Sequence, residues 1–149
     1  MNGLQISTLE SMVRDGGLRK LYRKHLPHMH WQSVETPTTG SGVPDSNFCY
    51  GNIEGWIENK AVKRSDRVEM RPEQCAWLER RARAGGKCFI AVRWTKADDA
   101  LYLLKPEAGR LLLAAGLAKL PSTYVLGRWH GGPANWDWPK IGRLLTISR

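Results

Sequence analysis

A two-residue turn constrains this chain more than any other feature of its sequence. Residues 43–50 and 53–62 are rich in strand-forming residues, and only Gly51-Asn52 separates them. Such a pair is typical of the tight turn of a β-hairpin. In a hairpin that turns on these two residues, opposed residue numbers sum to 103, the sum of 51 and 52. The predicted register therefore sets Asp45 directly opposite Glu58.

Three side chains of this hairpin suggest metal chemistry. Glu58 and Lys60 are two positions apart on one strand, so their side chains share a face, whereas the side chain of Asn59 points to the other face. Opposed carboxylates repel each other on a sheet, and a divalent cation between them would reverse that effect. Mg²⁺ and Mn²⁺ prefer such hard oxygen ligands. We therefore expect Asp45 and Glu58 to bind a metal ion, with Lys60 beside it to orient a water or stabilise charge on a phosphate.

The charge of the chain indicates a polyanionic partner. Lysine and arginine number 23 against 14 acidic residues, which gives a net charge of +9. Each phosphate that such residues neutralise releases counterions. The basic residues gather in three segments, and the segment at 60–67 brackets the predicted metal site. The candidate phosphate contacts are Lys63, Arg64, Arg67, Arg19, Lys20 and Arg80. These contacts would position the partner without reading bases, which favours recognition of shape over sequence.

The cysteines and the apolar segments exclude several classes of protein. Cys49, Cys75 and Cys88 are odd in number and widely spaced, without a CxxC pair. This pattern argues against a zinc ribbon and a disulfide framework, and it fits a reducing compartment. Residues 1–8 do not resemble a signal peptide, and the longest apolar run, 111–115, is too short to cross a bilayer. The chain is expected to be soluble and intracellular, with no membrane partner.

The remaining segments predict helices around further strands. Apolar spacing predicts a helix over 9–26, interrupted at 16–17, then a strand over 31–35 and a loop over 36–42. After the hairpin we expect a helix over 72–84, strands over 88–94 and 100–104, and a helix between Pro106 and Pro121. Residues 128–138 are expected to be irregular, and 141–147 to form a closing helix.

This order of elements predicts one domain over residues 1–149. It is an α/β or α+β fold, with a central mixed sheet flanked by helices. The predicted core spans about 31–104, and residues 105–149 are expected to pack onto it. Three tryptophans, Trp129, Trp136 and Trp138, are expected to make that contact, because each buries a large apolar area.

Four short stretches together resemble a known family. They are Gly42-Val43-Pro44-Asp45, Trp56-Ile57-Glu58-Asn59-Lys60, Arg71-Pro72-Glu73-Gln74 and Gly85-Gly86-Lys87-Cys88-Phe89-Ile90. They resemble the PD-(D/E)xK nuclease superfamily, and more narrowly its VRR-NUC and Holliday-junction-resolvase-like members, many of them encoded by bacteriophages. The resemblance covers about 35–94 and implies a restriction-endonuclease-like core.

The resemblance also implies roles for individual residues. Asp45 and Glu58 would bind Mg²⁺ or Mn²⁺, with the backbone carbonyl of Asn59 as a further ligand. Lys60 would serve the attacking water, and Gln74 would lie beside the active site. The family often adds an acid from the first helix, for which Glu10 is the candidate, and Glu35 is its rival. The middle residue of the Glu-x-Lys motif is usually less polar than asparagine.

These features together lead us to expect a metal-dependent DNA endonuclease, and the resemblance implies that it leaves a 5′-phosphate. We expect a structure-selective enzyme, such as a junction resolvase or flap nuclease acting on branched or duplex DNA. The resemblance implies a homodimer, and the cytoplasm of a bacterial or phage-infected host cell as its location. One alternative is a homing or restriction-like endonuclease with a defined target sequence. The other is a non-catalytic nucleic-acid-binding or virion-associated protein with a nuclease fold.

Overall fold

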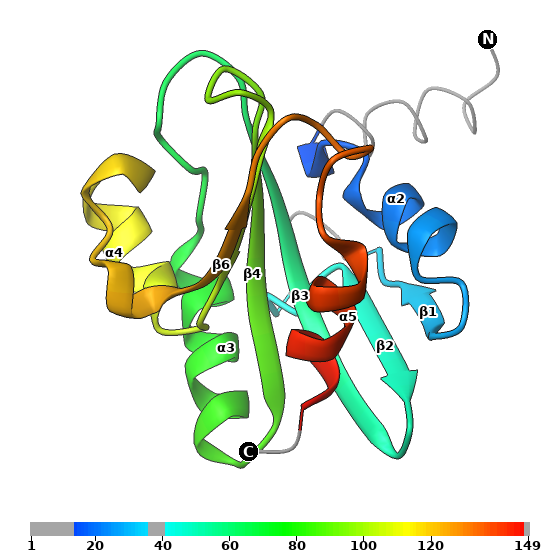
Figure 1. The fold of residues 1–149 in the computed structure, drawn as a ribbon. Helices are drawn as coiled ribbons and strands as arrows, with labels where there is room; N and C mark the ends of the chain where they lie inside the picture. The colour runs from blue at the N-terminus through cyan, green and yellow to red at the C-terminus, as the bar shows by residue number, and fades with distance from the viewer. Residues whose placement is uncertain (1–13, 36–40, 148–149) are drawn as a thin grey trace, which may run out of the picture.

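One mixed β-sheet runs through the molecule. The computed structural model describes residues 14–35 and 41–147, and these form a six-stranded sheet with helices on both faces (Figure 1). The strands follow one another across the sheet in chain order. They are β1 (His30–Ser33), β2 (Ser46–Tyr50), β3 (Ile53–Val62), β4 (Lys87–Trp94), β5 (Ala100–Leu104) and β6 (Val125–Trp129). Only β3 and β4 are parallel, and the other neighbours are antiparallel. The predicted mixed sheet of an α/β fold is thus confirmed.

The helices cover the sheet in pairs. The described part of the chain contains α2 (Leu18–His25), α3 (Pro72–Arg83), α4 (Ala108–Ala114) and α5 (Trp138–Thr146), with short 3₁₀ turns at Leu117–Lys119 and Ser122–Tyr124. Helix α3 makes the crossover that joins the parallel strands β3 and β4. Helices α2 and α5 lie on one face, and α3 and α4 lie on the other (Figure 1). Among the described residues, no helix is long and apolar enough to cross a bilayer.

Each face of the sheet carries its own apolar core. Because side chains alternate along a strand, Ile57 packs under α2 and α5, whereas Ile90 packs under α3 and α4. The first core also contains Tyr22, Trp136 and Trp138, and Trp129 packs against it. The prediction that the C-terminal tryptophans pack on the sheet is confirmed.

The predicted hairpin register is confirmed along the whole β2–β3 ladder. Tyr50 pairs with Ile53, and the pairing continues to Ser46 and Ile57, so opposed numbers sum to 103 at every step. Gly51 and Asn52 both have positive φ, 58° and 65°, as the tight turn requires. The ladder ends one pair before Asp45, which lies in a bend.

The C-terminal third differs from its prediction. Residues 125–129, expected to lie partly in an irregular segment, form the edge strand β6 on β5. The segment is only half-buried and contains Gly127, so it lacks the run of alternating residues that marks a strand. The helix expected between Pro106 and Pro121 ends at Ala114. The closing helix begins three residues earlier than expected, because the Asp137 side chain accepts a hydrogen bond from the Lys140 backbone.

Candidate active site

The carboxylate of Asp45 is held by one neighbouring residue. Its Oδ1 accepts hydrogen bonds from both the backbone N–H of Asn59, at 3.0 Å, and the side-chain Nδ2 of Asn59, at 2.8 Å. The backbone carbonyl of Asp45 accepts from Val34 at 2.9 Å, which ties the bend to the segment after β1. These bonds fix Asp45 at the point where β2 begins.

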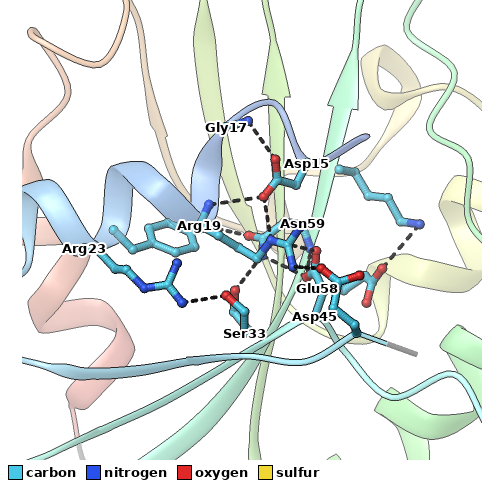
Figure 2. A network of polar contacts seen from close by, with 12 residues as sticks. Asp15, Gly17, Arg19, Arg23, Ser33, Asp45, Glu58 and Asn59 are labelled. Carbon is cyan, nitrogen blue, oxygen red and sulfur yellow. Dashed lines mark hydrogen bonds and ion pairs between the residues drawn. The ribbon is translucent and has the colours of Figure 1, made fainter. Parts of the chain in front are cut away.

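The Asn59 side chain is part of this site, which differs from the sequence prediction. It lies on the face of β3 opposite Glu58, as strand alternation requires, but its amide reaches the Asp45 bend. Its Oδ1 accepts from the Tyr22 hydroxyl at 2.5 Å, and its Nδ2 also donates to Ser46 Oγ at 2.9 Å. Burial raises the pKa of Tyr22 well above its ordinary value, so its hydroxyl remains a donor. Helix α2 therefore orients Asp45 through Asn59 (Figure 2).

Glu58, Lys60 and Gln74 meet on the other face of β3, beneath the first turn of α3. Glu58 is only 5% exposed, and its Oε1 accepts from Gln74 Nε2 at 3.0 Å. The Lys60 Nζ lies 3.4 Å from the same Glu58 oxygen and donates to Gln74 Oε1 at 3.0 Å. Gln74 also caps α3 by accepting from the backbone of Arg71 at 3.0 Å. The glutamine thus fixes the glutamate and the lysine relative to each other.

Ionising both acids is costly at this site. Burial raises the pKa of Asp45 to about 6, although the Asn59 backbone and the Arg19 guanidinium lower it. Burial and then the charge of Asp45 raise the pKa of Glu58 to about 7, against the opposing effect of Lys60. The two carboxylates are therefore close enough to repel each other (Figure 2). This oxygen pair suits a hard divalent cation, which would relieve the repulsion.

The third acid near the site is one that sequence reasoning missed. Asp15 is 3% exposed, and its carboxylate accepts from the backbone of Gly17 at 2.8 Å and of Arg19 at 3.3 Å. Glu35, the predicted rival ligand, has a 65% exposed side chain and contacts Arg19 at 3.2 Å. Glu10 lies outside the described residues. An aspartate shortly before an amphipathic helix is a helix-start signal, because its carboxylate can accept from the first backbone N–H groups, and this signal marks Asp15.

Two acidic side chains alone form the core of the candidate metal site. Among residues 14–35 and 41–147, no group of three or more histidine, cysteine, aspartate or glutamate side chains is placed to share an ion. A metal ion there would complete its shell with water, a substrate phosphate or a backbone carbonyl, as Mg²⁺ commonly does. The carbonyl of Asn59 as such a ligand remains a prediction.

Arg19, one of the predicted DNA contacts, lies among the acids. Its Nε is 2.8 Å from Asp15 Oδ2 and 4.0 Å from Asp45 Oδ2, and its side chain is only 12% exposed. Its charge is therefore already compensated inside the protein (Figure 2). The other candidate phosphate contacts, Lys20, Lys63, Arg64, Arg67 and Arg80, are exposed, and their contact with DNA remains a prediction.

The glycine before Asp45 docks the bend onto α3. Gly42 has φ +83°, and a Cβ added there would lie 2.2 Å from the backbone carbonyl oxygen of Glu73. We expect Gly42→Ala to lower the free energy of unfolding by about 2–4 kcal/mol, through left-handed strain and overpacking against backbone that cannot move away. Urea denaturation of both proteins measures this loss.

Gly51 provides the matched control for this substitution. It also has positive φ, +58°, but nothing lies within 4 Å of the added Cβ. Gly51→Ala should therefore lower the free energy of unfolding through the left-handed strain alone, by about 1 kcal/mol. Equal losses for the two variants would show that Gly42 does not dock the Asp45 bend against α3.

The chain matches no protein-family model and no curated protein sequence.

Proposed function

We propose that this protein is a Mg²⁺- or Mn²⁺-dependent DNA endonuclease that hydrolyses phosphodiester bonds. The observation that carries the proposal is the convergence of Asp45, in the bend before β2, and Glu58 on β3, with Lys60 held 3.4 Å from Glu58. Glu58 is buried and Asp45 half-buried, and the pKa values of both are raised. Such a pair indicates a functional site, because withdrawing paired like charges from water has no benefit for folding. The mixed sheet with helices on both faces supports a restriction-endonuclease-like core.

Asp45 and Glu58 would hold the metal ion. Within the described residues the hydrogen bonds to Asp45 fall on Oδ1 and the one to Glu58 falls on Oε1. Glu58 Oε2 is therefore proposed for coordination, together with Asp45 Oδ2, which faces the Arg19 Nε at 4.0 Å. When bound, the ion supplies Lewis acidity that polarises the scissile phosphate and lowers the pKa of a bound water. The Asn59 carbonyl is proposed as a further ligand. The protein itself contributes the fixed geometry of the two acids.

Lys60 is proposed to act on the attacking water or on the phosphate. An ammonium group has three donors; Gln74 accepts one at 3.0 Å, and Glu58 Oε1 lies 3.4 Å from the same nitrogen. The remaining donor allows Lys60 to orient the nucleophile or to stabilise charge that develops on the phosphate oxygens. Gln74 is proposed as the positioning residue of the lysine and of Glu58.

The net charge of +9 supports DNA as the substrate, and the exposed basic residues beyond Lys60 support contacts with flanking phosphates. We propose selectivity for branched DNA, as in a junction resolvase or a flap nuclease, with a 5′-phosphate product. Cutting two strands of a junction would require a homodimer. The proposed setting is the cytoplasm of a bacterial or phage-infected cell.

A panel of DNA substrates tests the proposal directly. We expect cleavage of a four-way junction or a flap in Mg²⁺ or Mn²⁺, weaker cleavage of linear duplex and single strand, and none in EDTA. Gel analysis of end-labelled products measures the preference and the position of the cut. Tight binding without cleavage of any substrate would favour a non-catalytic nucleic-acid-binding protein. Cleavage of linear duplex at one sequence would favour the homing or restriction-like alternative.

A further inference from the structure

An arginine stacked on two tryptophans lies close to the proposed active site. The guanidinium carbon of Arg81 is 5.9 Å from the ring centre of Trp56 and 5.4 Å from that of Trp77. The two indole rings contact each other edge to face, with ring centres 5.4 Å apart. Trp56 belongs to β3, and Trp77 and Arg81 belong to α3. We call these three residues the Arg81 cluster.

The Arg81 cluster shares a face of the sheet with the proposed catalytic residues. Trp56 is two positions before Glu58 on β3, so their side chains point the same way. Helix α3 runs back along β3 (Figure 1), and Arg81 follows Gln74 by seven residues, about 10 Å along the helix. A strand of DNA rises about 3.4 Å per nucleotide. The Arg81 cluster is therefore about three nucleotides from the site.

Polar residues extend this face past the cluster. Asn47 on β2 pairs with Trp56, and Gln32 on β1 pairs with Asn47, so the three form one row across the sheet. Helices α3 and α4 cover the strands from β3 onward, and Gln32 is exposed. One acid, Glu54, lies on this face towards the hairpin turn, where its Oε1 accepts from Asn47 at 3.2 Å. The row runs parallel to the Asp45–Glu58 pair, two residues nearer the hairpin turn on each strand.

Arg81 has no ionic partner among the described residues, whereas several other arginines do. Arg19, Arg93 and Arg110 each lie within 3 Å of a carboxylate oxygen. In the described part of the chain, no carboxylate lies within ion-pair distance of Arg81, which is exposed. The indole N–H of Trp56, buried in the cluster, also has no acceptor among these residues. Stacking restrains the guanidinium while its donors remain available, as favours phosphate binding.

We propose that the Arg81 cluster binds a backbone phosphate of the DNA strand that leads away from the cut, with the row of Gln32 and Asn47 beneath that strand. The inference rests on the proposed nuclease function and names the path of its substrate. It assigns to Arg81 a positioning role, because this residue would bind DNA about three nucleotides from the reacting phosphate.

Arg81→Gln tests the proposal, and Arg128→Gln is its matched control. Arg128 is also exposed and stacked on an aromatic ring, that of Tyr102 at 5.8 Å, but it lies on β6, three strands from β3. We expect Arg81→Gln to weaken binding of a fluorescent flap DNA about tenfold in EDTA. The slope of the logarithm of the binding constant against the logarithm of the salt concentration should also fall, by the equivalent of about one phosphate contact. Arg128→Gln should bind like the wild type. Fluorescence anisotropy over a salt series measures both quantities.

The two proposals fail in different ways in this experiment. Binding by Arg81→Gln equal to that of the wild type would overturn the DNA path, whether or not the wild type cleaves. Absence of cleavage by the wild type, with binding still lost in Arg81→Gln, would overturn the nuclease and leave the binding surface. Equal losses of DNA affinity in the Arg81 and Arg128 variants would mean that each arginine contributes only through the net charge of the protein. That outcome would also overturn the proposed DNA path. Arg81→Lys, which keeps the charge but not the planar stacking group, should recover binding only in part.

Discussion

Asp45→Asn is expected to abolish metal-dependent cleavage, with a loss of at least about 10³-fold in the single-turnover rate. The substitution removes one negative charge but leaves an oxygen that accepts from Asn59, so the bend should keep its position. DNA binding in EDTA should be equal to that of the wild type or tighter, because a charge that repels phosphate is lost. Single-turnover cleavage and anisotropy on the same substrate separate the two effects.

Glu35→Gln is the matched control for this change. Glu35 also contacts Arg19, at 3.2 Å, but its carboxylate is exposed. Its substitution should change the cleavage rate less than about threefold if it is not a metal ligand. Full activity of Asp45→Asn would place the metal elsewhere. A loss in Glu35→Gln as large as that in Asp45→Asn would instead make Glu35 a member of the site.

The central hairpin could be predicted from the sequence because its determinants are local. Gly51 and Asn52 supply the two positive φ angles of the turn, and strand alternation then sets the register as far as Ser46 and Ile57. The same local rules place Glu58 and Lys60 on one face. These rules do not predict that the ladder ends before Asp45. The bend at Asp45 depends on the Asn59 side chain and on a backbone hydrogen bond from Val34.

The remaining parts of the site depend on residues distant in sequence. Tyr22 reaches Asn59 across 37 positions, and no spacing rule predicts that bond. Arg19 belongs to a run of basic residues typical of a surface, yet it lies between two carboxylates because α2 packs against β1 beside the Asp45 bend. Gln74 was expected at the site only through a family resemblance. Its capping bond to Arg71 supplies the physical reason that the side chain points towards Glu58.

The edge strand β6 was missed for a similar reason. Its five residues include a glycine and an exposed arginine, and they bury no continuous apolar face. The strand forms because β5 offers an unpaired edge, which is a tertiary effect. The Arg81 cluster likewise combines residues of β3 and α3 that the sequence separates by 25 positions. Its aromatic partners are visible in the sequence, but their stacking is not.

Glu58→Gln is expected to stabilise the metal-free protein while it abolishes metal binding. Burial and the charge of Asp45 raise the pKa of Glu58 from an ordinary 4.5 to about 7. Between these values the folded protein binds more protons than the unfolded chain, so its free energy of unfolding falls as pH rises. Glutamine is neutral throughout. In EDTA the variant should gain nothing below pH 4.5 and about 1–3 kcal/mol above pH 7.

Thermal unfolding with and without Mn²⁺ measures both halves of this prediction. The gain in EDTA corresponds to a Tm increase of several degrees, at about 2–4 °C per kcal/mol for a chain of this size. Mn²⁺ should raise the Tm of the wild type, because it binds only the folded state, and should leave the Tm of Glu58→Gln unchanged. The difference between the Tm values of the two proteins should therefore shrink, or change sign, when Mn²⁺ is added.

Glu79→Gln supplies a control of opposite sign. Its hydrogen bond from Arg110 lowers the pKa of Glu79, so this carboxylate stabilises the fold above its ordinary pKa. Its substitution should lower the Tm slightly in EDTA at neutral pH and leave the response to Mn²⁺ intact. If both variants were more stable than the wild type, the gain would come from removing any acidic side chain and would not be specific to Glu58. A Glu58→Gln protein that is less stable than the wild type at pH 8 in EDTA would show that Glu58 contributes to folding, and the case for a metal-binding acid would lose its main physical support.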